Sequence, residues 1–262
     1  MANYSCPFCN HHRSWRVRGK KRKCTSCRRE FGGCTYPVLG FRLTKAAWQK
    51  AIATFLRERT EARIAEEVGV SRKTAQKMAH YFRVKMRGEI PDIFSGIVEM
   101  DEAYIGGQRK NKRLHIRRIQ GKRGHGTDKL PIVGLFSRES RQVFVDVEPK
   151  KLDLVYIFKT IQERVVPGSP IYTDGFKMYR QLPRIGYLHE YVDHAGGEYV
   201  RGDVHTNNIE GFWGIMKRKL GCIGGMRRNR LHLFVAEIVW KFNHREESLK
   251  DRERALWRLV LR

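Results

Sequence analysis

Apolar residues in the first part of the chain recur with the spacing of α-helices. From Thr44 to Met86 they return at helical intervals, as on the buried face of a helix. The stretch IAEEVGVSRKTA, residues 64–75, predicts a helix, a turn at Gly69 and a further helix capped by Ser71. The preceding helix is predicted by the spacing of Ala47, Trp48, Ala51, Ile52, Phe55 and Leu56.

After Pro91 the pattern changes to the short apolar and alternating runs of β-strands. This change predicts a second domain of the α/β class, in which helices cover a mixed sheet. The strands are expected at residues 96–102, 130–136, 142–147, 171–173 and 188–193, and the helices at about 152–165, 176–182, 207–220 and 232–242. The chain then divides into residues 1–36, a helical domain at 40–90, the α/β domain at 95–250 and a basic tail at 251–262.

Composition and charge limit the class of protein. With 262 residues, 41% of them hydrophobic, the chain is suited to one large globular domain with small satellites or to two modest domains. Lys and Arg number 53 against 27 Asp and Glu, which leaves a formal net charge of +26 and favours nucleic acid as the partner. The sequence lacks a long apolar run and begins without a signal-peptide pattern, so we expect a cytoplasmic, nucleoid-associated protein and no membrane partner.

Four of the six cysteines form two CxxC pairs. Cys6 and Cys9 are separated by fourteen residues from Cys24 and Cys27. Two such pairs supply four thiolates to one tetrahedral Zn²⁺ ion, which replaces the core that so short a segment cannot build. We therefore expect a zinc ribbon at residues 1–36. The alternatives are a redox CxxC motif and a pair of disulfides.

The helix, glycine turn and helix of residues 64–75 match the helix-turn-helix pattern. In this motif the second helix enters the major groove of DNA, and its first residues reach bases or phosphates. The alternative is an ordinary helical hairpin with a solvated basic face. The candidates for DNA contact are Arg72, Lys73, Gln76 and Lys77.

Three acidic residues lie at positions that the expected α/β domain would bring close together. Asp101 ends the first expected strand, Asp174 ends the fourth, and Glu210 lies one turn into the helix after the fifth. Three carboxylates converging from separate elements are what two Mg²⁺ ions about 3.5 to 4 Å apart require, and such a pair catalyses phosphoryl transfer. Taken singly, each acid has an alternative role as a helix cap, a turn residue or a solvated helix residue, and Asn207 or Asn208 is a competing third ligand.

Basic residues flank these acids in the sequence. Residues 108–125 carry eight Lys or Arg and no acid, which indicates either a solvated loop or a clamp on substrate DNA. Lys217 follows Glu210 by two helical turns and lies on the same helix face. The candidate DNA contacts are Arg109, Lys110, Lys112 and Arg113 on one side, and Arg218, Lys219, Arg227, Arg228 and Arg230 on the other.

We expect supporting or structural roles for several other side chains near the acids in the sequence. Trp213 is expected in the core rather than stacked on a base, because large aromatic residues contribute most through burial. Glu99 shares a strand face with Asp101 and is a candidate supporting group, whereas Glu102 points to the opposite face. His194 and His205 are candidates for a structural role, DNA contact or proton transfer.

Several stretches resemble the DDE transposases of bacterial insertion sequences, in the ISXO-type branch. They are MDEAYIGG, IYTDGF, DHAGGEYVRGDVHTNNIEGFWGIMKRKLGCIGG and VAEIVWKFNHR. With the order of ribbon, helix-turn-helix and α/β domain, the resemblance covers nearly the whole chain. It implies a ribonuclease-H-like fold, with Asp101, Asp174 and Glu210 as ligands of two Mg²⁺ or Mn²⁺ ions. Lys217 matches a basic residue that contacts DNA near the terminal phosphate.

The activity that this resemblance implies is cut-and-paste movement of DNA. Such an enzyme binds terminal inverted repeats in double-stranded DNA, cleaves the element ends and joins the freed 3′-hydroxyls to target DNA. Coordinated cutting of two ends predicts at least a dimer on DNA. The alternatives are a DNA-binding regulator without catalysis and a nuclease of the same fold that cleaves without joining.

Overall fold

The structure is a computed structural model of the whole chain, and it divides into two compact units. The first consists of Met1–Lys85 with Glu247–Arg262, and the second of Met86–Glu246. The residues that it describes are 6, 8–9, 11–19, 21–32, 35–36, 41, 43–89, 91, 93–106, 114, 129–147, 152–223 and 228–261.

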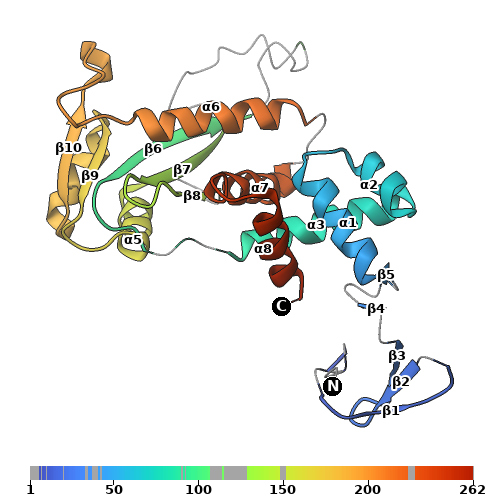
Figure 1. Cartoon of the computed structure of the whole chain (residues 1–262). Helices are drawn as coiled ribbons and strands as arrows, with labels where there is room; N and C mark the ends of the chain where they lie inside the picture. Colours follow the sequence, from blue (N-terminus) through green and yellow to red (C-terminus); the bar gives the residue numbers. More distant parts are fainter. Residues whose placement is uncertain are drawn as a thin grey trace. The chain divides into compact units, whose positions relative to one another are not determined.

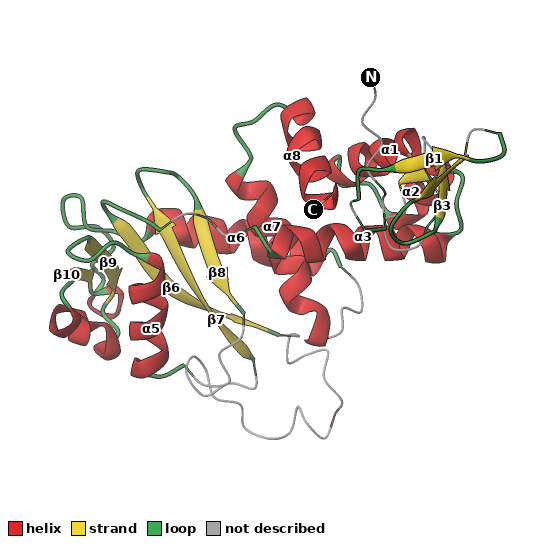
Figure 2. Cartoon of the chain, turned by 90° about the horizontal axis from the view of Figure 1, so that it is seen from below, coloured by secondary structure: helices red, strands yellow, loops and turns green. Residues whose placement is uncertain are grey.

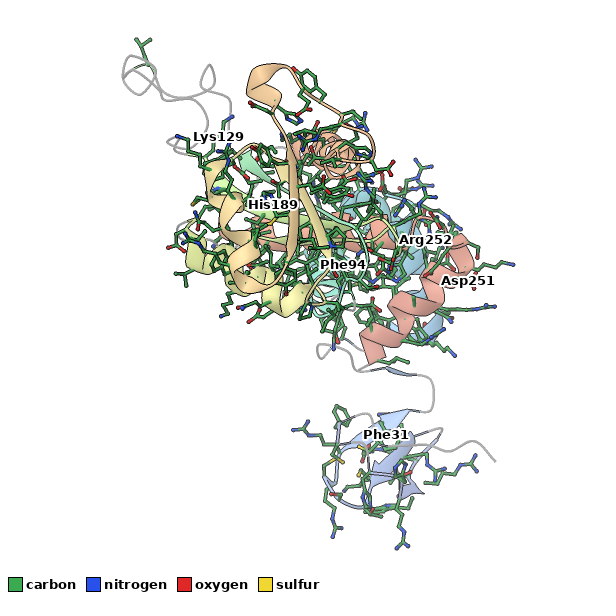
Figure 3. The ribbon with its side chains drawn as sticks, turned by 90° about the vertical axis from the view of Figure 1, so that its left-hand side faces the viewer. Phe31, Phe94, Lys129, His189, Asp251 and Arg252 are labelled. Carbon is green, nitrogen blue, oxygen red and sulfur yellow. The ribbon has the colours of Figure 1, made fainter. Side chains whose placement is uncertain are left out.

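The first unit begins with a small antiparallel sheet. Its strands β1 (Ser14–Arg16), β2 (Lys21–Cys24) and β3 (Glu30–Gly32) pair in the order β1-β2-β3. The residues buried in it are Phe31, Cys6 and Cys24, with Cys27 packed against them; Figure 3 shows the side chains of this segment, with Phe31 labelled. A two-stranded sheet of β4 (Thr35–Tyr36) and β5 (Leu43–Thr44) follows.

The helices predicted for the first unit are confirmed as α1 (Lys45–Leu56), α2 (Glu61–Val68) and α3 (Arg72–Arg87). Helix α2 ends at Gly69, whose φ of 75° is the left-handed conformation that favours glycine. The Ser71 hydroxyl accepts a hydrogen bond from the Thr74 amide (3.2 Å), so it caps α3 as expected.

Aromatic residues form the core of these helices. Trp48 is fully buried and packs edge-on against Phe82, with ring centroids 6.0 Å apart. Phe55 packs against Phe82 at 5.2 Å. The Thr54 hydroxyl donates a hydrogen bond to the Glu67 carboxylate (2.6 Å), which ties α1 to α2 and lowers the pKa of Glu67.

The C-terminal residues, expected as a basic tail at 251–262, form a helix instead. Helix α8 (Leu249–Leu261) packs against α1, and the Tyr81 hydroxyl of α3 donates to the Val260 carbonyl (3.1 Å). The reason is an apolar face that the many charged residues conceal in the sequence: Leu256, Leu259 and Val260 are buried at helical spacing.

The second unit is built on a mixed five-stranded sheet in the order β10-β9-β6-β7-β8. The central strand β6 pairs antiparallel with β7 and parallel with β9, and β10 is parallel to β9. Antiparallel β8 closes the other edge. The strands are β6 (Val98–Ile105), β7 (Leu130–Ser137), β8 (Val143–Asp146), β9 (Pro170–Asp174) and β10 (Leu188–Val192).

Helices cover both faces of this sheet, as Figures 1 and 2 show. Helix α5 (Leu154–Arg164) packs with Met100, Leu135 and Ile171 on one face. On the other face, α6 (Asn207–Gly221) and α7 (Leu231–Asn243) pack with Ala103, Ile132 and Phe136. The predicted α/β class with a mixed sheet and flanking helices is therefore confirmed.

Two elements differ from the expectation. Strand β6 runs on to Ile105, where it pairs with Leu130, so Asp101 lies within the strand rather than at its end. The segment expected as a helix at 176–182 is a 3₁₀ element, η3 (Lys177–Ile185), with Pro183 inside it. Proline lacks the N–H that an α-helix needs. None of the described helices has the length and apolarity required to cross a membrane.

Candidate active site and metal centre

Asp101 stands in the middle of the central strand, on the face that α6 covers. The Trp213 indole N–H of α6 donates a hydrogen bond to its carboxylate (3.0 Å). Burial, together with the negative charges of Asp174 and Glu210, raises the pKa of Asp101 to about 7. The other two acids predicted from the sequence, Asp174 and Glu210, are therefore close enough to act on the charge of Asp101.

Asp174 reaches this place through the register of the parallel pair. Val98 and Glu99 of β6 lie beside Ile171 and Tyr172 of β9. The same register, continued for two more residues, would bring Asp174 level with Asp101. Its carboxylate also accepts a hydrogen bond from the Phe176 amide (3.1 Å). The alternative role of Asp174 as a helix cap is wrong, because the N-cap of η3 is Phe176 and no side chain caps it.

Glu210 comes from the first turn of α6. The Thr206 hydroxyl donates to its carboxylate (2.7 Å), and the side chain remains 46% exposed. His194 Nε2 lies 3.8 Å from the same carboxylate oxygen. Glu210 is thus the member of the cluster that solvent and ligands reach most easily.

Glu99 binds the beginning of α6 to the sheet. Its carboxylate is fully buried and accepts hydrogen bonds from the backbone amides of Asn208 (2.9 Å) and Ile209 (3.1 Å). It also accepts from the Asn208 side chain (2.7 Å) and from Arg138 Nε (2.8 Å). A carboxylate on the free amides of a helix N-terminus acts as its cap. Glu99 thereby supports Glu210, and Asn208 is engaged in this contact.

Gly134 makes room for the indole that holds Asp101. It lies directly opposite Asp101 in the β6–β7 pair. A Cβ atom at this position would stand 2.5 Å from the Trp213 ring. The interpretation of Trp213 as a core residue is confirmed, since it is 3% exposed.

Glu102 points to the opposite face, as the strand alternation predicts. There it accepts a hydrogen bond from the hydroxyl of buried Tyr179. Burial, with the charges of Asp101 and Asp174, raises the pKa of Glu102 to about 8.

The four cysteines of the CxxC pairs come together in the N-terminal sheet. Their sulfur atoms all lie within 4.8 Å of one another. Cys6 and Cys27 are 3.5 Å apart, and Cys9 and Cys24 are 3.6 Å apart. Sulfurs at tetrahedral corners about 2.3 Å from one Zn²⁺ ion are ~3.8 Å apart, so this cluster fits a zinc site.

The predicted DNA contacts are placed only in part. Arg72, Lys73, Gln76 and Lys77 are all exposed along the beginning of α3. Lys217 and Arg218 are exposed on α6, Lys219 is half-buried, and Arg230 is exposed before α7. Arg109, Lys110, Lys112, Arg113 and Arg227 lie outside the described residues, as does the side chain of Arg228.

A basic cavity of about 500 Å³ lies beside the start of α6. Arg138, Arg141 and Arg245 line it together with Asn207 and Phe242. Arg245 stacks over the Phe242 ring (4.1 Å) and donates to the Arg141 carbonyl (2.8 Å). The helix that carries Glu210 is thus bordered by guanidinium groups.

Arg138 and Gly134 are not among the residues predicted from the sequence. Besides Glu99, Arg138 holds the carbonyls of Asp203 (2.8 Å) and His205 (3.0 Å) and thereby fixes the approach to α6. Its other contact, with His205 Nδ1 (2.9 Å), gives that histidine a structural role. The sequence signal for Gly134 is its position within an apolar strand, where a glycine often marks the close approach of another group.

Comparison with known proteins agrees with this arrangement. Residues 93–243 match the ISXO2-like transposase domain. The chain is 31% identical over 240 residues to an uncharacterized protein in transposable element ISH50 of Halobacterium salinarum, covering 86% of this chain and 81% of that one. An uncharacterized transposase-like protein of Haemophilus influenzae is 31% identical over 86 residues, which are 33% of this chain and 69% of that one. The chain belongs to the ISXO2-like transposase family.

Similarity to solved structures is slight. A chain of the simian T-cell lymphotropic virus intasome, in complex with PP2A regulatory subunit B56 gamma, is 12% identical with a TM-score of 0.35. The match covers 73% of this chain and 67% of that chain. The Mos1 transposase paired-end complex is 11% identical with a TM-score of 0.27, covering 78% of each chain.

Replacing Cys24 with Ser should remove bound zinc and unfold the N-terminal sheet, because three thiolates and a core of this size do not hold the segment. We expect one zinc per chain in the wild type by atomic absorption and a large loss in the variant. Cys222→Ser, at an exposed cysteine, is the matched control and should keep its zinc. Equal zinc content in all three proteins would contradict the site.

Gly134→Ala should destabilise the second unit by about 1–3 kcal/mol, because the added methyl group overlaps the Trp213 ring. Urea unfolding followed by tryptophan fluorescence measures the change. Gly211→Ala is the control, since a Cβ there meets nothing within 4 Å, and it should stabilise α6 by about 0.4–1 kcal/mol. Equal effects at the two glycines would refute the packing argument.

In metal-free buffer, Asp101→Asn should raise the free energy of unfolding at pH 8 by on the order of a few kcal/mol. Folding raises the pKa of Asp101 from 3.8 to about 7. The folded wild type is therefore destabilised as the pH rises through that window, whereas the amide variant is not. The gain should shrink at pH 5 and vanish below pH 4.

Denaturant unfolding at several pH values measures this difference. Glu190→Gln, which changes an exposed acid of β10 in the same sheet, should show none of it. A gain that does not depend on pH would mean that the three acids do not repel one another.

Proposed function

We propose that this transposase cleaves the ends of its DNA element and joins the 3′-hydroxyls to target DNA at Asp101, Asp174 and Glu210. The observation that carries the proposal is the position of Asp101, which is buried and held by Trp213, with Asp174 and Glu210 near enough for their charges to raise its pKa. Such crowding of negative charge is costly in a folded protein and is typical of a functional site. A ribonuclease-H-like fold is part of the proposal, supported by the antiparallel β6, β7 and β8 followed by parallel β9 and β10.

The donor set fits Mg²⁺ or Mn²⁺, which prefer carboxylate oxygens. Two such ions, when bound, activate the attacking oxygen and stabilise the leaving oxygen of a phosphodiester. The residues that would hold them are Asp101, Asp174 and Glu210. Trp213 fixes Asp101 by its hydrogen bond, and Thr206 fixes Glu210.

Basic groups around the acids are proposed to hold the DNA. Lys217, exposed two turns after Glu210, would contact DNA near the terminal phosphate. The exposed residues Arg72, Lys73, Gln76 and Lys77 of α3 would read the terminal inverted repeats in the major groove. Arg109, Lys110, Lys112, Arg113, Arg218 and Lys219 would line the path of the substrate. Since two ends are cut together, we propose a dimer or larger oligomer on DNA.

Asp101→Asn, Asp174→Asn and Glu210→Gln should each lower cleavage and strand transfer by at least about 10³-fold, because metal ligation supplies several kcal/mol of transition-state stabilisation. The assay uses labelled DNA with the sequences that flank the gene, in Mg²⁺ and in Mn²⁺. DNA binding, followed by mobility shift, should remain largely intact, and Glu190→Gln should match the wild type in both assays.

The products distinguish the alternatives. Joined products from the wild type alone establish the transposition chemistry. Nicked products that are never joined would favour a nuclease, and binding without cleavage in either metal would favour a regulator. Strand transfer retained by any of the three variants would remove that residue from the site.

A further inference from the structure

An exposed tyrosine stands beside the acid cluster. Tyr199 is 63% exposed and its neighbour Val200 is 52% exposed. Both lie between β10 and α6, where the chain projects past the end of the sheet before entering α6 (Figure 1). The side chains in this part of the unit are drawn as sticks in Figure 3, where His189 of β10 is labelled.

The segment that carries Tyr199 is held by its own hydrogen bonds. The Asp193 carbonyl accepts from the amides of Gly196 (3.0 Å) and Glu198 (2.9 Å). Arg201 and Val204 exchange two backbone hydrogen bonds of 3.0 Å each, and the Arg201 guanidinium donates to the Tyr191 carbonyl (2.6 Å). The exposed ring is therefore presented by a fixed backbone.

One imidazole separates this ring from Glu210. The rings of Tyr199 and His194 lie 5.1 Å apart at an angle of 31°, and His194 Nε2 is 3.8 Å from the Glu210 carboxylate. From the Tyr199 ring through the His194 ring to the Glu210 carboxylate, these two contacts together span about 10 Å. This length corresponds to roughly three nucleotide steps of ~3.4 Å along a DNA strand. One face of the tyrosine ring packs toward His194, and its 63% exposure leaves surface for another flat group.

We infer that Tyr199 is a stacking site for a nucleobase of the DNA strand held at the acid cluster, within about three nucleotides of the scissile phosphate. The inference rests on the proposed function. An exposed aromatic ring accepts the π-face of any base. A base stacked here keeps its own strand next to Glu210, so Tyr199 is a positioning residue.

The test compares three substitutions at one position in the full-length protein. Tyr199→Phe keeps the ring and should stay within about 2-fold of the wild type in strand transfer. Tyr199→Leu and Tyr199→Ala should lose about 5- to 150-fold, the range that corresponds to one base stack. Leu188→Ala, at an exposed residue of β10, is the matched control and should not change the rate.

Abasic substrates separate stacking from a merely structural role. A single abasic nucleotide is moved through the three positions on either side of the cleavage site. At one of these positions, the abasic nucleotide should lower the strand-transfer rate of the wild type as much as the Tyr199→Ala substitution does on intact DNA. At the same position it should not lower the rate of the Tyr199→Ala variant any further. Losses that add at every position, or a Tyr199→Ala variant as active as the wild type, would overturn the inference.

A binding readout keeps the test independent of catalysis. 2-Aminopurine at the position found above, or at each of the six positions in turn, should be quenched when the wild type or Tyr199→Phe binds, and not when Tyr199→Leu binds. If the wild type quenches the probe but cleaves nothing, the stacking site stands and the proposed function fails. If the wild type cleaves DNA but quenching at every position is independent of the Tyr199 ring, the stacking site alone fails.

Discussion

The burial of Asp101 close to two further acids, Asp174 and Glu210, is the constraint on which the second unit depends. Asp101 lies in the central strand β6, which is paired on both sides, so its backbone has no freedom to move away from Asp174. The apolar packing on the two faces of the sheet must therefore offset the cost that the raised pKa of Asp101 expresses. In the proposed mechanism the protein gives up this stability for a site that takes up cations.

Strand β6 also determines where the third acid stands. Glu99 caps the first amides of α6, and Asp101 accepts the hydrogen bond from Trp213 in its second turn. Glu210 lies between these two attachments, and the gap at Gly134 lets the helix approach the sheet at that point. One strand thus supplies an acid of the cluster and fixes the helix that carries another. The carboxylate of Glu99 accepts four hydrogen bonds, which compensate for its burial in the core.

Much of this arrangement follows from the sequence, and the exceptions have physical reasons. The strands that carry Asp101 and Asp174 and the helix that carries Glu210 follow from their apolar pattern, whereas the helix expected after Asp174 is the 3₁₀ element η3 with Pro183 inside it. Helix α8 was missed because its three buried residues are dispersed among charges. The partners of Glu99 are beyond local prediction, since Arg138 and Asn208 reach it from positions 39 and 109 residues away. No periodicity encodes such contacts.

The overall positive charge of the chain contrasts with the negative charge at the acid cluster. A net charge of +26 attracts the phosphate backbone at long range, in a way that salt weakens. At the acid cluster the sign is reversed, so a phosphodiester that arrives there meets repulsion from three carboxylates. In the proposed mechanism DNA binding and catalysis therefore respond to different ions: monovalent salt competes with the basic surface, whereas divalent cations remove the barrier at the cluster. In that mechanism the basic surface holds the DNA, and cleavage becomes conditional on the metal.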